Sequence, residues 1–408
     1  MRPLLRCLNH HNLTLRRKES HRRLALPPHL FRRVQQTECS SSRLHSSTTT
    51  AGTTIGSRTR SQDEIQKLIQ ARVQERDSWT DERMTLSGVL KVTWEFPFKF
   101  RPPTQEELDN EFPLQQLDWD LIQNPDQDKI QLTWLGHASV LIQFHGWCIL
   151  ADPIFSDRCS PVQFAGPMRY QPPPCSLEDL VEKLSIDTVL ITHNHYDHLD
   201  YSTVKYLAEH SDASFVLPLG LRKWFHSNVS TSITTYEQDW HETYELEHTD
   251  GHSPALSVTA VPMRHWTNRT GDRDKTLWCG FALQSKSSKI LIPGDTAWFD
   301  GLKTVGDDYG PFDVAALPIG AYEPRDFMKT NHINPDEAVR MKDSVQAKHA
   351  VPVHWGTFPL TYEPALEPRE RLLELMKSRQ DRETFQSWLI GETKVFDGGQ
   401  EHDESSSR

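Results

Sequence analysis

The stretch from Val189 to Asp200 constrains the fold of this 408-residue chain more than any other part of it. It begins with the apolar run Val189–Thr192, which is typical of a buried strand. Three histidines and two aspartates follow within the eight residues from His193 to Asp200. So many imidazoles and carboxylates at a strand end need metal ions, hydrogen-bond partners or water. The stretch therefore predicts a sheet with a polar site at one edge.

The spacing His193-Asn194-His195-Tyr196-Asp197-His198 indicates a metal site. On an extended backbone, His193, His195 and Asp197 would share one side, with His198 turned to the other. Two neighbouring metal ions can then each receive a pair of ligands, and both imidazole and carboxylate suit zinc. A lone His-x-His is most often a surface loop, whereas this longer pattern after an apolar strand is strong evidence for metal binding.

Three further candidate ligands lie just beyond the ends of other short apolar runs. His265 follows Leu256–Val261, Asp295 follows Ile290–Ile292, and His354 follows Ala350–Val353. In layered α/β domains, sites gather at strand ends because the sheet holds several loops together. The chain has 20 histidines, so any single one is more often a surface or core residue than a ligand. The shared context favours these three residues as ligands.

The rest of the pattern predicts an α/β or α+β layered domain. Further apolar runs of strand length are 130–135, 140–144, 148–151, 215–217 and 314–317. Helices are predicted over 62–77, 202–210 and 368–378, and Asn334, Pro335 and Glu337 mark the start of another. We expect a compact domain over 129–397, a helix and extended linker packed on it over 61–128, and a disordered tail over 398–408.

Residues 1–60 differ sharply in charge from the remainder. They hold 12 Lys and Arg against two acids, whereas the remainder holds 33 basic and 54 acidic residues, a net charge of −21. The basic segment predicts a disordered mitochondrial targeting peptide, with a processing region at 43–47. A disordered basic tail that contacts anionic lipid or RNA is the alternative. The acidic remainder argues against nucleic acid as a partner.

The sequence also bears on membranes and on the redox compartment. No stretch approaches the roughly 20 uninterrupted apolar residues of a transmembrane helix, so a membrane-spanning chain is excluded. The aromatic run Trp94–Phe100 either covers an edge of the core or dips into a lipid interface. The six cysteines are scattered without a Cys-x-x-Cys pair, which favours a reducing compartment.

The motif His193–His198 resembles that of the metallo-β-lactamase superfamily, whose four-layer αβ/βα sandwich carries two metals between its sheets. Further segments are similar to the N-acyl-phosphatidylethanolamine-hydrolysing phospholipase D family; they are Thr133–Ala138, Asp152–Phe155, Gly294–Thr296, Ile319–Arg325 and His354–Phe358. The likeness covers roughly 105–391. Its most specific parts are Gly-Ala-Tyr-Glu-Pro-Arg at 320–325 and His-Trp-Gly-Thr-Phe at 354–358.

This resemblance implies a site with two zinc ions per chain. His193, His195 and His265 would hold the first ion, Asp197, His198 and His354 the second, and Asp295 would bridge them. Asp197 and Asp295 are the implied catalytic residues, Tyr196 and His332 the implied contacts to the lipid head group, and Asp152 an acid that orders the loops. Two alternatives stay open: Tyr196 packs beside the metals, and His332 caps the following helix.

The implied reaction is hydrolysis of N-acyl-phosphatidylethanolamine to N-acylethanolamine and phosphatidic acid by a hydroxide held between two metals, with Asp197 accepting a proton. The resemblance also implies a homodimer at a membrane surface, which we expect to be mitochondrial or another intracellular membrane. Two other functions remain open. One is a different hydrolase of the superfamily, such as a lactonase or another phosphodiesterase, and the other is a metal- or lipid-binding protein without catalysis.

Overall fold

The computed structural model describes residues 53–54, 60–80 and 101–399. Residues 1–52 of the predicted targeting segment, the aromatic run Trp94–Phe100 and residues 400–408 of the predicted tail lie outside this description. In the described part, no helix is both long enough and apolar enough to cross a membrane.

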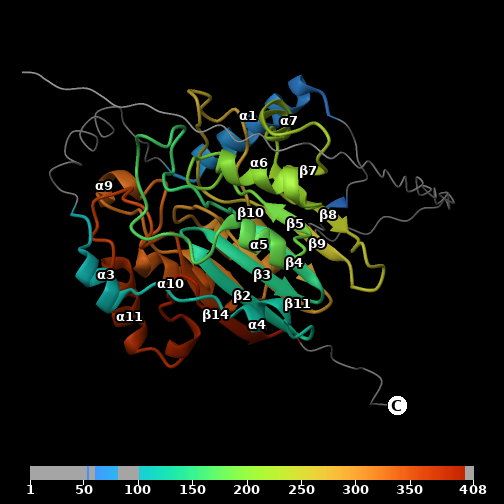
Figure 1. The fold of residues 1–408 in the computed structure, drawn as a ribbon. Coiled ribbons are helices and arrows are strands. Elements are labelled where there is room, and N and C mark those ends of the chain that lie inside the picture. Colours follow the sequence, from blue (N-terminus) through green and yellow to red (C-terminus); the bar gives the residue numbers. More distant parts are fainter. Residues whose placement is uncertain (1–52, 55–59, 81–100, 400–408) are drawn as a thin grey trace, which may run out of the picture. The chain divides into compact units, whose positions relative to one another are not determined.

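The strands form two seven-stranded sheets (Figure 1). The first sheet has the order β1 (Thr53–Thr54), β8 (Glu242–Leu246), β9 (Leu256–Val261), β10 (Gly280–Ser285), β11 (Ser288–Ile292), β12 (Phe312–Pro318) and β13 (Ala347–Val353). The second has the order β14 (Thr393–Asp397), β2 (Lys129–Gly136), β3 (Ser139–Phe144), β4 (Trp147–Ala151), β5 (Thr188–Leu190), β6 (Ser214–Pro218) and β7 (Thr235–Gln238).

Strand direction brings several loops to one edge of each sheet. In the first sheet, β11, β12 and β13 pair in parallel, and β9 runs the same way because β9 and β11 are both antiparallel to β10. In the second sheet, β4, β5, β6 and β7 are parallel. The carboxyl ends of parallel strands meet at a common edge, so the loops that follow these strands lie close together.

In the described residues, the helices lie in the connections between strands. They are α1 (Gln62–Ser78), α3 (Gln105–Glu111), α4 (Trp119–Gln123), α5 (Leu177–Lys183), α6 (Tyr201–His210), α7 (Arg222–Asn228), α8 (Gly301–Tyr309), α9 (Arg325–Met328), α10 (Pro335–Ser344) and α11 (Glu367–Lys377). A short 3₁₀ helix spans Arg382–Thr384.

Successive residues of a strand face opposite sides of the sheet, and packing on both sides of the two sheets gives four layers. In β3, Val140 and Ile142 face the core shared with the other sheet, while Leu141 belongs to a separate apolar cluster. That second cluster takes its helical residues from α4, α5, α6 and α7, which therefore cover the outer face of the second sheet. Helix α10 contacts β12 and β13 and packs against α8 and α11 on the side of the first sheet. The predicted αβ/βα sandwich is confirmed.

The predicted elements compare closely with the observed ones. All nine predicted strands are present, and so are the helices predicted over 62–77, 202–210 and 368–378. Asn334 caps α10 as expected: its side chain accepts from the Glu337 backbone N–H, and Pro335 opens the helix. Strands β1, β7, β8, β10 and β14 were not predicted. Strands β7 and β8 are half-exposed and carry polar residues at positions that a buried strand would fill with apolar ones, whereas β10 is buried at five of its six residues.

Candidate metal centre

Nine buried or half-buried side chains converge where the two sheets present their strand ends. Strand β5 leads to His193–His198, and β9, β11 and β13 lead to His265, Asp295 and His354. The nine form three overlapping groups, in each of which the potential ligand atoms lie within 4.8 Å of one another. The groups are His193, His195, His265 and Asp295; His137, Asp197, His198 and His354; and Asp295, His332 and His354. All seven predicted ligands are therefore brought together.

His193, His195 and His265 form the first half of the centre, which we call the three-histidine group. Nε2 of His193 lies 2.9 Å from Nδ1 of His195, and Nε2 of His265 lies 3.2 Å from the same atom. Three ring nitrogens from two different sheets thus point at one another. Convergent imidazole nitrogens are the donor set that divalent zinc and related ions prefer.

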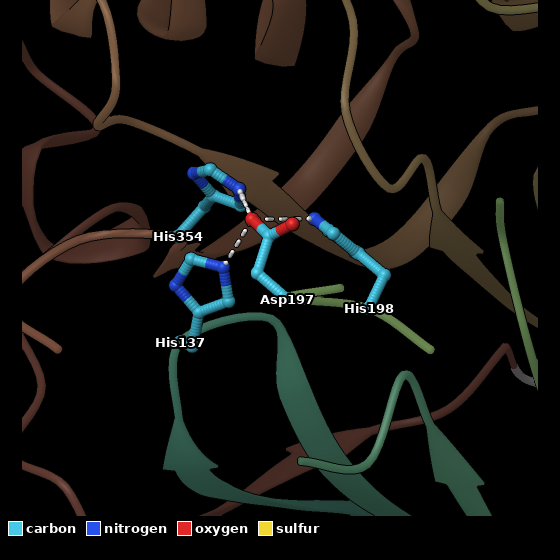
Figure 2. A group of neighbouring side chains, drawn as sticks. All are labelled: His137, Asp197, His198 and His354. Carbon is cyan, nitrogen blue, oxygen red and sulfur yellow. Dashed lines mark hydrogen bonds and ion pairs between the residues drawn. The ribbon is translucent and has the colours of Figure 1, made fainter. Parts of the chain in front are cut away.

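Asp197, His198, His354 and His137 form the second half, which we call the aspartate group (Figure 2). Asp197 lies at its centre, and the histidine Nε2 atoms surround its carboxylate. Oδ2 of Asp197 is 2.9 Å from His137, 3.3 Å from His354 and 3.6 Å from His198. This group therefore combines a carboxylate with imidazoles, whereas the first half has imidazoles alone.

Asp295 lies between the two halves. Its Oδ2 atom is 3.6 Å from Nε2 of His265 and 3.2 Å from Nε2 of His198, and its Oδ1 atom is 3.1 Å from Nε2 of His354. One carboxylate thus reaches histidines of both halves. This geometry is what a bridging ligand between two ions requires, and the bridging role of Asp295 stays a prediction.

The backbone of the motif differs from the extended arrangement considered from the sequence. It turns after His195, and the N–H groups of His198 and Leu199 both donate to the His195 carbonyl, at 3.2 and 2.8 Å. The turn directs Asp197 away from His193 and His195 and into the same half as His198. The backbone is therefore not extended here, because a hydrogen-bonded turn replaces the pleat, and Asp197 lies with His198 and His354, the grouping that the resemblance implies.

Groups behind the histidines fix the orientation of the rings. Nδ1 of His198 lies 2.8 Å from Asp152 Oδ2, and the Thr192 N–H donates to Asp152 Oδ1 at 2.8 Å. Nδ1 of His265 lies 3.0 Å from the carbonyl oxygen of Asn331. An Nδ1–H that donates outward leaves the Nε2 lone pair directed at the centre, which is the usual arrangement of metal-bound histidine. Asp152 thus lies behind the site and orders its loops, as predicted.

The electrostatics of the three-histidine group and of the pair His198 and His354 are opposite. Burial lowers the pKa of His193 and His265 well below the ordinary value, and lowers that of His195 to about 4. Burial alone would also lower the pKa of His354, but Asp295 and Asp197 raise it to about 9. The same carboxylates, with Asp152, raise the pKa of His198 well above its ordinary value. The aspartate group therefore attracts positive charge.

The residues present fit a divalent metal ion. Nε2 of His198, Nε2 of His354 and Oδ1 of Asp295 are buried and lack a hydrogen-bond partner. Leaving such atoms unpaired costs about 1–3 kcal/mol each, more for charged groups. A cation held among them would satisfy these atoms and balance the two carboxylates, so the cluster has the donors that a divalent metal ion requires.

A cavity of about 520 Å³ opens onto this centre. Asp197 and Asp295 form part of its polar lining, and Tyr196 and His332 line it as well. Its apolar lining includes Trp266, Phe327, Met328 and Leu360. The space therefore offers a charged end at the metal ligands and an apolar wall beside them.

The structure separates the alternatives left open for the two predicted substrate contacts. Asn334, not His332, caps helix α10, so the capping alternative for His332 was wrong. Tyr196 does pack, but against Arg269, whose guanidinium carbon is 4.1 Å from the Tyr196 ring centre. Nη1 of Arg269 also donates to the carbonyls of Asn194 and Leu199, at 3.2 and 2.7 Å. Arg269 thereby joins both ends of the ligand-bearing loop and supports the Tyr196 ring.

His137 is the residue that the sequence analysis did not single out. It lies in the tight turn between β2 and β3, with a positive φ of 52°, and its backbone N–H donates to Thr357 Oγ1 at 2.7 Å. A single histidine among apolar residues gave no periodic or spacing signal. His137 lies in the segment Thr133–Ala138, and the resemblance of this segment to the family is the one sequence signal that points to it.

Residues 148–355 match the model of the beta-lactamase superfamily domain. A metallo hydrolase of solved structure from the archaeon Ignicoccus hospitalis aligns with a TM-score of 0.49 and 20% identity, over 66% of this chain and 98% of that one.

Two relatives have names that state a function. The N-acyl-phosphatidylethanolamine-hydrolyzing phospholipase D 1 of Caenorhabditis elegans is 39% identical over 307 residues, which are 73% of this chain and 84% of the relative. The mitochondrial enzyme of the same name from Saccharomyces cerevisiae is 31% identical over 269 residues, which are 65% of this chain and 56% of the relative. This chain therefore belongs to the N-acyl-phosphatidylethanolamine-hydrolysing phospholipase D family of the β-lactamase superfamily, and it is a metal-dependent phosphodiesterase.

Proposed function

We propose that this chain hydrolyses N-acyl-phosphatidylethanolamine to N-acylethanolamine and phosphatidic acid with two zinc ions. The observation that carries the proposal is the pair of ligand groups that share Asp295 and face one cavity. The printed names of the worm and yeast relatives support the choice of substrate. Zinc is favoured by the histidine and carboxylate donors.

Each half of the centre would hold one ion. The three-histidine group would bind the first and the group of Asp197, His198 and His354 the second, with Asp295 reaching both. Bound ions would lower the pKa of a water molecule and neutralise the charge of the phosphodiester. Oδ2 of Asp197, oriented by His137 and His354, would take the proton of the attacking water.

The cavity would position the lipid. The phosphorus–oxygen bond to the ethanolamine would break, with the new oxygen on phosphorus coming from water. Tyr196 and His332 would contact the head group, and Trp266, Phe327 and Leu360 would receive apolar chains. Arg273, stacked on Trp266 with its guanidinium carbon 4.8 Å from the ring centre, would attract the phosphate.

We further infer that the protein is a peripheral mitochondrial membrane protein and a homodimer. The printed name of the yeast relative and the basic composition of residues 1–60 support mitochondrial targeting. A fluorescent fusion of the full chain, compared with one lacking residues 1–60, tests the location. Light scattering on the purified chain tests the dimer.

Metal analysis and lipid hydrolysis on one preparation test the activity. The substrate is N-acyl-phosphatidylethanolamine in mixed micelles, with products identified by mass. We expect about two zinc ions per chain and release of N-acylethanolamine. The Asp197→Asn variant serves as control, because it keeps the shape of the side chain and loses the carboxylate that accepts the proton.

The possible failures have different meanings. Two bound ions without lipid hydrolysis would contradict the substrate, and lactones and other phosphodiesters would then be assayed. Full activity of Asp197→Asn would contradict its role as proton acceptor. A preparation that binds no metal at any concentration would contradict the whole assignment.

A further inference from the structure

The loop between β4 and α5 exposes large apolar side chains. We call residues 160–168 of this loop the apolar tip. Phe164 is 86% exposed, Met168 53% and Val162 37%. In the described ranges, the other large hydrophobic residues exposed to this degree are Tyr201 and Val395, which lie in separate elements. Three such side chains within seven residues form a patch that needs an explanation.

The fold holds this tip in place. The Cys159 N–H donates to the Pro167 carbonyl at 3.2 Å, and the Arg169 N–H donates to the Asp157 carbonyl at 2.9 Å. The buried Arg169 guanidinium donates to the Ile154 carbonyl at 2.9 Å and to that of Ser156 at 3.0 Å. Both strands of the loop are thus tied at the base, and Phe164 projects from a supported structure.

The tip begins at the wall of the catalytic cavity. Cys159, at its base, lines that cavity together with Asp197 and Leu360. Cys159 also packs with Ile154 and Phe358 in a small apolar cluster of its own. A surface that binds the tip would therefore lie beside the space in which the substrate reacts.

The charge of the tip differs from that of the rest of the chain. Residues 160–168 contain no charged side chain, although residues 61–408 carry a net charge of −21. The nearest charged residues are Asp157, Arg158 and Arg169; Arg169 is buried and donates to backbone carbonyls, and the Arg158 side chain donates to the Gly166 carbonyl. A neutral apolar tip of this kind suits the interface of a phospholipid bilayer, where aromatic and aliphatic side chains are buried.

We propose that the apolar tip inserts into a phospholipid bilayer and holds the cavity at the membrane surface. The inference rests on the proposed phospholipid substrate, because a lipid must pass from the bilayer to the metal centre. A soluble substrate would give no reason to expose Phe164 beside the cavity.

Vesicle binding of the full chain tests this role. The probe is a phosphatidylcholine vesicle at a salt concentration that screens the basic residues of 1–60. Wild type is compared with the double variant Phe164→Ser/Met168→Ser, and Val395→Ser on β14 is the matched control. We expect the double variant to bind about tenfold more weakly or worse, since burying one large apolar side chain is worth at least that factor. Val395→Ser should bind like wild type.

Two activity assays separate the surface from the chemistry. Hydrolysis of bis(4-nitrophenyl) phosphate, a soluble phosphodiester, should be the same in wild type and the double variant, since neither residue lines the cavity. Hydrolysis of N-acyl-phosphatidylethanolamine in vesicles should fall in parallel with vesicle binding. Equal melting temperatures will show that the variants are folded.

Each contrary result identifies what is wrong. Unchanged vesicle binding of the double variant would overturn the proposal. So would a shift from dimer to monomer with vesicle binding retained, because the tip would then be a protein contact. If vesicle binding falls as expected while no phosphodiester is cut by wild type, the membrane-binding tip stands and the proposed function fails.

Discussion

The three-histidine group and the pair His198 and His354 of the aspartate group use histidine in opposite ways. In the three-histidine group, burial keeps His193 and His265 neutral by lowering their pKa, and the rings point at one another. In the aspartate group, carboxylates raise the pKa of His198 and His354 despite the same burial. Asp295 is the largest cause that raises the pKa of His198 and His354, and Asp197 adds to it for both, with Asp152 contributing for His198.

This contrast shows what the protein must supply before a metal binds. Neutral imidazoles have lone pairs that are free to bind a metal ion. The aspartate group favours a positive charge, so without a metal ion His198 and His354 bind protons instead. Asp295 joins the two environments, since it touches histidines from both. Mutations in the two halves should therefore have different effects, whereas removal of Asp295, which the halves share, should affect both.

Metal removal should have the largest effect. We expect a chelator to abolish phosphodiester hydrolysis, because without cations both halves lose the charge that neutralises the substrate. The free energy of unfolding should also fall, by about 2.7 kcal/mol relative to protein in free metal at 100 times its dissociation constant. Calorimetry with and without chelator measures the change in the free energy of unfolding. Re-addition of zinc should restore both this free energy and the hydrolytic activity. Unchanged stability and activity would mean that the centre binds no metal.

The Asp295→Ala variant should be the most damaging substitution, because this carboxylate serves both halves. Residues that merely support metal ligands cost about 10–100-fold in activity or affinity when replaced, so the loss here should exceed about 100-fold. Metal content should drop as well. Asp307→Ala, which removes a half-exposed acid of α8, is the matched control and should behave like wild type. An active, fully loaded Asp295→Ala variant would refute the shared role.

Substitution within one half should separate the halves. We expect His193→Ala and His198→Ala each to retain about one of two metal ions, since the other half keeps its own ligands. Metal titration with mass spectrometry of the folded protein measures the stoichiometry directly. If His193→Ala loses both ions, the halves are not independent and the contrast drawn above has no functional meaning.

Much of this centre was predictable from the sequence, because each ligand follows a strand. The apolar runs ending at Val261, Ile292 and Val353 specify strands β9, β11 and β13, and parallel direction brings their ends together. The strand pattern therefore predicted that His265, Asp295 and His354 lie close together, although it gave no distances. The four layers follow from the same alternation of buried strands and amphipathic helices.

What escaped prediction depended on backbone turns and side-chain packing. The turn after His195, which moves Asp197 into the other half, has no hydrophobic pattern to reveal it. Arg269 supports Tyr196 from a distant loop, and such a contact is set by tertiary packing alone. Among the strands, β7 and β8 are half-exposed and therefore lack the apolar runs by which nine others were found.

His137 provides the finest test of the contrast, because it belongs to the aspartate group alone. Burial lowers its pKa to about 3, so the ring is neutral and its Nε2–H can donate to Asp197 Oδ2, 2.9 Å away. A neutral donor at this position orients the carboxylate without competing for the proton that Asp197 would accept. His137→Ala should therefore lower kcat by about 10–100-fold, as expected for loss of a group that supports a metal ligand.

The conservative variant decides between orientation and ligation. His137→Gln keeps an N–H donor that can reach Asp197, so it should restore part of the activity lost in His137→Ala. Metal content should stay near that of wild type in both variants if His137 acts by orienting Asp197. Loss of one metal ion in both would instead make His137 a ligand, and the aspartate group would then differ from the three-histidine group in the number of its donors as well as in charge.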